Sequence, residues 1–132
     1  MSKSAKETEK IGEKFAKHLK PGDVVCLYGD LGYGKTTFVK GVAKGLGLTA
    51  RITSPTFTII RTYNNMHHVD LYRIEDETQL AEIGIKEILE DPSSIKLIEW
   101  PEKMAELPRQ RWSIVFEMNK DSDRTIKIDK HE

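Results

Sequence analysis

The sequence predicts one α/β domain with a mixed sheet, helices beside that sheet and an antiparallel hairpin at the C-terminal end. Three observations predict this fold class. A short apolar run at residues 24–28 leads into a glycine-rich segment and then into a helical pattern. More short apolar runs and a further helical pattern follow along the chain. The last two runs flank a short polar turn, which is typical of two antiparallel neighbouring strands.

The composition fits a folded globular domain. Charged residues make up 32% of the chain and hydrophobic residues 38%, which argues against disorder. Lys+Arg and Asp+Glu both number 21, so the totals lack the basic excess of proteins that bind nucleic acid by themselves. The single cysteine, Cys26, lies in an apolar run and is expected to be a buried thiol. The first ten residues lack an apolar signal region and no run reaches membrane-spanning length, so we expect a cytoplasmic protein without membrane contact.

The first half of the chain alternates helical and extended patterns. Apolar residues at helical spacing predict an amphipathic helix from about residue 4 to 19, which "KPGD" ends. The run "VVCLY" at 24–28 predicts a buried strand, and "KTTFVKGVAKGLG" predicts a helix that ends near Gly45 or Gly47. Segments 56–63 and 67–72 are rich in β-branched and aromatic residues and predict two strands. The "NN" between them allows either a hairpin or two strands joined by a loop.

The second half adds the remaining elements. Residues 77–91 carry a helical periodicity that Gly84 interrupts. "SIKLIEW" at 94–100 predicts another short apolar strand, which Pro101 closes. "WSIVFEMN" and "TIKIDK" alternate around "KDSD" and predict the closing antiparallel hairpin. This hairpin is the reason to expect a mixed sheet.

The glycine-rich segment, residues 29–36, reads Gly-Asp-Leu-Gly-Tyr-Gly-Lys-Thr and matches the phosphate-loop pattern G-x-x-x-x-G-K-[ST]. Its glycines allow backbone N–H groups to face inward, and the following helix adds a positive N-terminus. Lys35 is expected to reach the β- and γ-phosphates and the Thr36 hydroxyl to ligate Mg²⁺. The alternative is a glycine-rich turn between two core elements. The preceding strand and following helix favour a P-loop NTPase-like domain.

A site of this kind needs a carboxylate near Mg²⁺ at the end of a neighbouring strand. Glu99 ends "IKLIE", and the pattern favours it over Asp70, which ends the less apolar "MHHVD". Either acid could instead be an ordinary carboxylate at a strand end. Side-chain alternation predicts that His68, Asp70 and Tyr72 share a face, with His68 filling space or satisfied by a neighbour. "TSPTFT" at 53–58 offers hydroxyls for a γ-phosphate, although its pattern favours an ordinary Ser-Pro turn.

Four segments occur in order: "LYGDLGYGKTTF", "SPTFT", "HVDLYR" and "LIEWPE". Together they resemble the bacterial TsaE family, also called YjeE, the ATPase of tRNA threonylcarbamoyladenosine biosynthesis. The resemblance runs from the helix that bears Thr8 to Glu102. It implies one P-loop ATPase domain over residues 1–132, which binds and hydrolyses ATP with Mg²⁺. It also implies action with a TsaD–TsaB complex, through which tRNA is engaged indirectly. The oligomeric state is left open.

The resemblance also implies roles for individual positions. Lys35, Asp70 and Glu99 would be catalytic, and Thr36, Asp70 and Glu99 would lie at the magnesium ion. The ATP-binding residues would be Thr8, Gly29, Asp30, Leu31, Gly32, Tyr33, Gly34, Lys35, Thr36, Thr37 and Trp100. "SPTFT" matches a switch-like loop, and Arg73 matches an arginine without an assigned role. Tyr33 replaces the usual alanine, which bears on nucleotide affinity more than on activity.

Two other function classes share the phosphate loop. A small P-loop kinase would need an acceptor pocket and usually an arginine-rich lid, whereas residues 51–73 hold only three scattered arginines. A regulatory module that binds a nucleotide without useful hydrolysis is the other class. The intact Lys35, Thr36 and Glu99 argue against it. We expect hydrolysis that is slow in the isolated protein and changed by its partners.

Overall fold

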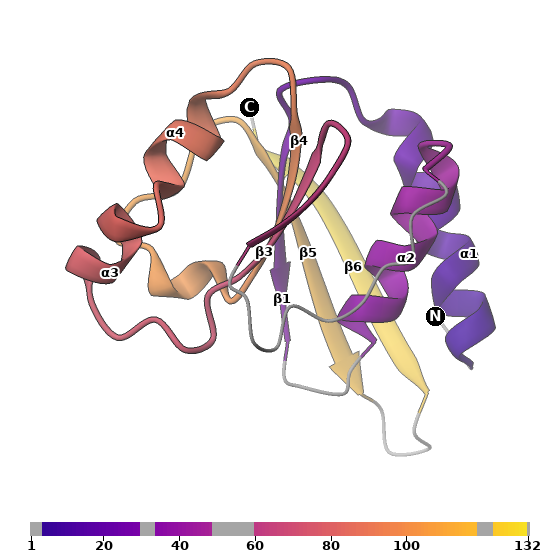
Figure 1. Ribbon diagram of the computed structural model, residues 1–132. Helices are drawn as coiled ribbons and strands as arrows, with labels where there is room; N and C mark the ends of the chain where they lie inside the picture. Colours follow the sequence, from indigo (N-terminus) through magenta and orange to yellow (C-terminus); the bar gives the residue numbers. More distant parts are fainter. Residues whose placement is uncertain (1–3, 30–33, 49–59, 119–122, 132) are drawn as a thin grey trace.

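The computed structural model describes residues 4–29, 34–48, 60–118 and 123–131 (Figure 1). Six of its elements are strands of a single sheet, in the spatial order β2-β3-β4-β1-β5-β6. The strands are β1 (Val24–Tyr28), β2 (Ile60–Tyr63), β3 (Met66–Asp70), β4 (Ile95–Glu99), β5 (Arg111–Met118) and β6 (Arg124–His131). The helices are α1 (Ala5–Phe15), α2 (Lys35–Gly45), α3 (Glu77–Glu82) and α4 (Ile85–Glu90), with 3₁₀ turns at Ala16–His18 and Pro101–Lys103.

The sheet is mixed, as the sequence predicted. Strands β3, β4, β1 and β5 run parallel, whereas β2 and β6 pair antiparallel with β3 and β5 at the two edges. The predicted C-terminal hairpin is therefore confirmed as β5–β6. The segments around "NN" also form a hairpin, β2–β3, with Asn64 in the left-handed conformation at φ 54°. The expected strand residues 56–59 lie outside the described part of the chain.

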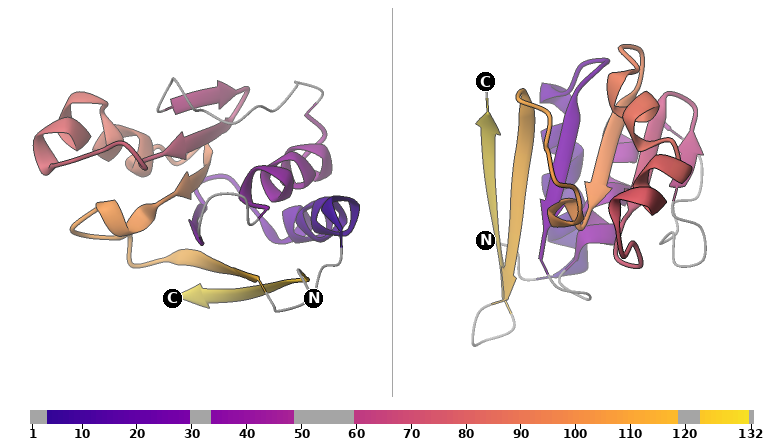
Figure 2. Two further views of the ribbon diagram at one scale, coloured as in Figure 1. Left: turned by 90° about the horizontal axis from the view of Figure 1, so that it is seen from below. Right: turned by 90° about the vertical axis from the view of Figure 1, so that its left-hand side faces the viewer.

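Two helical layers cover the sheet (Figure 2). Helices α1 and α2 pack on one face, and α3 and α4 lie on the other. Alternation along β1 supplies both cores, since Val25 and Leu27 face α2 while Val24 and Cys26 face α3 and α4. Cys26 is fully buried, as expected. Among the helices that the structure describes, none is long and apolar enough to cross a membrane.

Several predicted elements end earlier than their sequence patterns. The helix expected to reach residue 19 is α-helical only to Phe15 and continues as a 3₁₀ turn. The periodic segment 77–91 is two helices because Gly84 takes a left-handed conformation, φ 75°, at the start of α4. The strand expected to reach residue 72 ends at Asp70. There the Asp70 Oδ1 accepts a hydrogen bond from the Tyr72 amide, which turns the backbone out of the sheet.

Helices α1 and α2 approach each other at backbone contact distance. A methyl group added at Gly12 would overlap the Phe38 carbonyl oxygen, and one added at Gly41 would overlap the Glu9 carbonyl oxygen. This close packing places Thr8 of α1 near Gly34, which begins α2. The side-by-side arrangement of the two helices is visible in Figure 1. The contact therefore brings part of the N-terminal helix to the glycine-rich loop.

Candidate nucleotide site

The N-terminus of α2 forms one wall of the candidate site. Gly34 lies before the helix with φ 95°, and no side chain caps the helix start. The first turn has no acidic residue, so within the described ranges neither a capping side chain nor an acidic residue of this turn meets the N–H groups there. Thr36 and Thr37 lie in this turn and are half-buried. The N–H donors of this first turn, together with the positive helix end, suit an anion such as phosphate.

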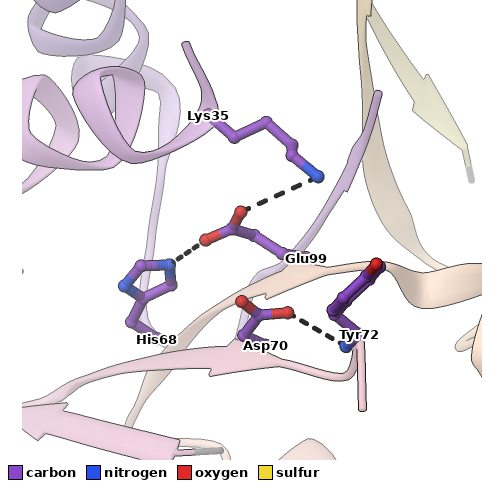
Figure 3. A network of polar contacts seen from close by, with 5 residues as sticks. All are labelled: Lys35, His68, Asp70, Tyr72 and Glu99. Atoms are coloured by element: carbon purple, nitrogen blue, oxygen red, sulfur yellow. Dashed lines mark hydrogen bonds and ion pairs between the residues drawn. The ribbon is translucent and has the colours of Figure 1, made fainter. Parts of the chain in front are cut away.

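Lys35 extends from α2 toward the carboxyl end of β4 (Figure 3). Its Nζ lies 3.8 Å from Glu99 Oε1, and both side chains are buried. The same Nζ lies 4.6 Å from the centre of the Trp100 ring. Within the described part of the chain, it has no hydrogen-bond partner. A buried ammonium without hydrogen bonds retains three donors for an incoming acceptor.

The Glu99 carboxylate lies between Lys35 and His68. Its Oε2 is 2.6 Å from Nε2 of His68, and the His68 side chain is fully buried. A carboxylate in its ionised form can only accept, so with that form of Glu99 this bond requires the hydrogen on Nε2 of the imidazole. The expectation that a neighbour satisfies His68 is therefore confirmed for one ring nitrogen. The neighbour is Glu99, which lies opposite Asp70, the other candidate acid, in the pairing of β3 with β4.

Asp70 and Glu99 occupy paired positions at the ends of β3 and β4. Burial raises the pKa of Asp70, and the Glu99 charge adds to the rise, while the Tyr72 amide, Lys35 and His68 oppose it. The sequence pattern favoured Glu99 over Asp70 as the carboxylate near Mg²⁺, as if only one of the two would be there. The parallel register instead places both carboxylates at the same edge of the sheet, beside the start of α2 (Figure 3).

Trp100 follows Glu99 in an unusual backbone conformation, with φ 61° and ψ 49°. A bulky residue in the left-handed region is rare, and such strain gathers at functional sites. The ring lies 5.0 Å from that of Tyr72 and beneath the Lys35 ammonium. Its indole Nε1 is buried and unpaired among the described residues. Trp100 thus lines the site, whereas Trp112 packs against Phe15 at the core.

Thr8 and Gly34 meet a residue that sequence reasoning missed. A Cβ built on Gly34 would lie 3.3 Å from Arg124 Cδ and 3.5 Å from Thr8 Cγ2. Arg124 begins β6, and its Nε is buried with no hydrogen-bond partner in the described ranges. No motif marks this arginine in the sequence, because only the β5–β6 hairpin brings it to the phosphate loop. A second cationic side chain, half-buried, thus lies beside Gly34.

Not every predicted site residue is described. Asp30, Leu31, Gly32 and Tyr33 of the phosphate loop, and the segment 53–58, lie outside the described residues. Gly29, at the end of β1, has φ 142°, and a Cβ there would lie 2.9 Å from the Phe116 carbonyl oxygen. A side chain at this position therefore meets both backbone strain and a steric clash.

The donors fit a magnesium–nucleotide complex. Thr36, Asp70 and Glu99 offer oxygen ligands, and Lys35 with the α2 N-terminus offers positive charge for phosphate. In the part of the chain that the structure describes, no group of three or more His, Cys, Asp or Glu could hold a metal ion. Magnesium bound through one or two carboxylates, waters and substrate phosphates needs no such group.

Comparison with known proteins places this arrangement in a family. The family model "Threonylcarbamoyl adenosine biosynthesis protein TsaE" matches residues 2–126. The tRNA threonylcarbamoyladenosine biosynthesis protein TsaE of Bacillus subtilis strain 168 is 45% identical over 125 residues, covering 91% of this chain and 77% of that protein. The protein of the same name from Treponema pallidum strain Nichols is 38% identical over 132 residues, covering 97% of both chains.

A solved structure agrees with the fold. The crystal structure of Bacillus subtilis YdiB superposes with a TM-score of 0.81 at 38% sequence identity. The match covers 99% of this chain and 83% of the YdiB chain. The sequence resemblance is therefore confirmed by the family model and the curated relatives, and the solved structure confirms the fold. The chain belongs to the TsaE family of threonylcarbamoyl adenosine biosynthesis proteins.

Proposed function

We propose that this chain binds MgATP at the carboxyl edge of its sheet and hydrolyses it to ADP and inorganic phosphate. The hydrolysis supports threonylcarbamoyl modification of the tRNA adenosine next to the anticodon, in a complex with TsaD and TsaB. The observation that carries the site is the buried Lys35 ammonium at the start of α2, 3.8 Å from Glu99 and without a hydrogen bond in the described chain. Family membership supports the pathway.

Phosphate binding follows from the charges at the start of α2. In the described structure Glu99 is the carboxylate nearest to the Lys35 ammonium. A phosphate oxygen at the helix N-terminus would give Lys35 a second anionic partner and supply the hydrogen bonds it lacks. Trp100, 4.6 Å away, would keep the ammonium on the phosphate side of β4. Lys35 would then stabilise charge on the phosphoryl oxygens, the main catalytic lever in such sites.

The two acids, Glu99 and Asp70, would then bind Mg²⁺ and orient the attacking water. Bound Mg²⁺ would neutralise charge on the β- and γ-phosphate oxygens. Thr36 and Glu99 would hold it, and Asp70 at the adjacent strand end would orient the attacking water. Burial is the main cause that raises the pKa of Asp70 in the ligand-free protein, and its carboxylate oxygens are the groups at this strand end that can accept a hydrogen from that water. Arg124, beside Gly34 and Thr8, would add positive charge next to the start of α2.

The test is release of inorganic phosphate from MgATP by the isolated protein and by its mixture with TsaD and TsaB. We expect slow release that the partners change and that Lys35→Ala abolishes. A rate of phosphate release that changes neither on adding the partners nor on the Lys35→Ala substitution would contradict the proposal. Transfer of the γ-phosphate to a small acceptor, with no inorganic phosphate formed, would favour a kinase instead.

A further inference from the structure

His68 is a fully buried histidine in the middle of a strand. It lies on the face of β3 that packs toward α2, where its same-face neighbour is the core residue Met66. An apolar side chain would fill this position without the cost of removing an imidazole from water. Buried polar groups of this kind are normally held by a specific partner. The partner here is Glu99.

The two oxygens of Glu99 have different neighbours. Oε2 lies 2.6 Å from His68 Nε2, whereas Oε1 lies 3.8 Å from Lys35 Nζ. The short contact on one oxygen fixes the plane of the carboxylate, because rotation of the group would break it. Figure 3 shows Oε1 turned away from His68 and toward Lys35 at the start of α2. Oε2 is thus bound to His68, and Oε1 faces the Lys35 ammonium.

We propose that His68 is a positioning residue that makes Glu99 a one-oxygen ligand. By donating from Nε2 to Oε2, it leaves Oε1 alone to meet a cation: Lys35 in the ligand-free protein and Mg²⁺ in the nucleotide complex. The inference rests on the proposed function, because the magnesium ion arrives with ATP. Partners that orient a metal ligand typically change metal affinity about 10–100-fold when removed.

The neighbouring histidine is a matched control. His67 lies on the same strand but points to the opposite face, is half-buried, and its Nδ1 lies 2.9 Å from the Thr62 hydroxyl oxygen. Its replacement removes an imidazole from β3 without touching Glu99. A general weakening of the strand would affect both positions, whereas loss of carboxylate positioning would affect His68 alone.

The experiment measures magnesium binding without hydrolysis. All proteins carry Trp112→Phe, so Trp100, next to Glu99, is the only tryptophan and its fluorescence reports the site. Each protein is saturated with ADP and titrated with MgCl₂, and ADP affinity without magnesium is measured separately. We expect His68→Leu to raise the half-saturating Mg²⁺ concentration about tenfold. ADP affinity without magnesium stays within twofold, and His67→Leu matches its parent.

His68→Gln tests the hydrogen bond itself. Its amide can donate to Oε2, so we expect a half-saturating Mg²⁺ concentration closer to that of the parent than to that of His68→Leu. The inference is overturned if His68→Leu binds Mg²⁺ as the parent does. It is also overturned if His68→Leu loses ADP affinity equally with and without magnesium, since that indicates a structural role. A parent that binds no ADP at all would instead refute the proposed function.

A second measurement on the unsubstituted protein keeps the inference testable if His68→Leu does not fold. Nitrogen-15 NMR of the imidazoles distinguishes the two histidine tautomers. We expect His68 to carry its hydrogen on Nε2, both without ligand and with MgADP bound. A hydrogen on Nδ1 alone would overturn the inference, because Nε2 could not then donate to Glu99.

Discussion

Lys35 and Glu99 form a buried pair that is poorly suited to stabilising the fold. Their charged atoms are 3.8 Å apart, beyond hydrogen-bond distance, and both side chains have lost their water. The attraction between buried charges repays the loss of hydration only when the geometry is good. The pair therefore contributes little stability, yet each charge needs the other while no ligand is bound. Such a pair can exchange one partner for a phosphate or a cation at low cost.

The first prediction concerns this mutual dependence. Glu99→Gln leaves the buried Lys35 ammonium without its nearest counter-charge, and we expect it to lower the free energy of unfolding by about 3 kcal/mol. Lys35→Met combined with Glu99→Gln removes both charges and should recover most of this loss. Urea denaturation of the parent, both single variants and the double variant measures the coupling. If the loss of unfolding free energy in the double variant equals the sum of the losses in the two single variants, Lys35 and Glu99 are not coupled and the prediction is wrong.

The buried thiol of Cys26 gives a pH-dependent prediction. Burial raises its pKa from 9.0 to about 11, against the smaller lowering effect of Arg111. Between these values the unfolded chain has lost the thiol proton and the folded chain retains it, so stability falls as pH rises. We expect the parent to lose about 1 kcal/mol between pH 8 and pH 10 relative to Cys26→Ala. Denaturant unfolding at both pH values measures the difference. Parallel pH profiles would contradict it.

Among the elements, the pairing of α1 with α2 depends on glycines. Gly12 and Gly41 each face backbone atoms of the opposite helix, so the helices pack without side chains between them at these points. This close approach brings Thr8 to the start of α2, beside Gly34. Spacing of the helices therefore controls the geometry of one side of the nucleotide site.

Gly41→Ala tests that contact with an effect of known sign. Alanine favours a helix over glycine by about 1 kcal/mol, so helix propensity alone predicts stabilisation. The overlap with the Glu9 carbonyl predicts the opposite, and we expect a net loss of about 2 kcal/mol. Lys40→Ala, on the exposed side of the same helix, is the control and should stay within about 0.5 kcal/mol. A more stable Gly41→Ala protein would refute the close packing.

The sequence was most informative where one local signal dominates an element. The apolar runs of β1 and β4 and the alternation of β5 and β6 gave the strands correctly. Element ends were less predictable because they depend on single contacts. Asp70 ends β3 by accepting from the Tyr72 amide, and Gly84 splits α3 from α4. The Asp70 contact leaves the hydrophobic periodicity unchanged, so the sequence reasoning did not detect it, whereas the interruption at Gly84 was visible in the sequence.

For the molecule as a whole, strand order determines the site. Placing β1 between β4 and β5, with β3 beyond β4, brings the ends of β1, β3 and β4 to one edge at the start of α2. The sequence pattern identified Lys35, Asp70 and Glu99 individually. It did not reveal the His68–Glu99 contact or the place of Arg124, because both depend on which distant strands become neighbours. Their roles toward a nucleotide stay predictions.

The most direct test of the central claim is calorimetric titration of MgATP into three proteins: the parent, Lys35→Met and Lys40→Met. Lys35 and Lys40 belong to the same helix, but only Lys35 is buried beside Glu99. Loss of one phosphate-binding ammonium should weaken binding at least tenfold, since hydrogen bonds to charged groups contribute about 1.5–3 kcal/mol. We predict this loss for Lys35→Met and parent-like affinity for Lys40→Met. Equal affinity in all three proteins would contradict a phosphate site at the start of α2.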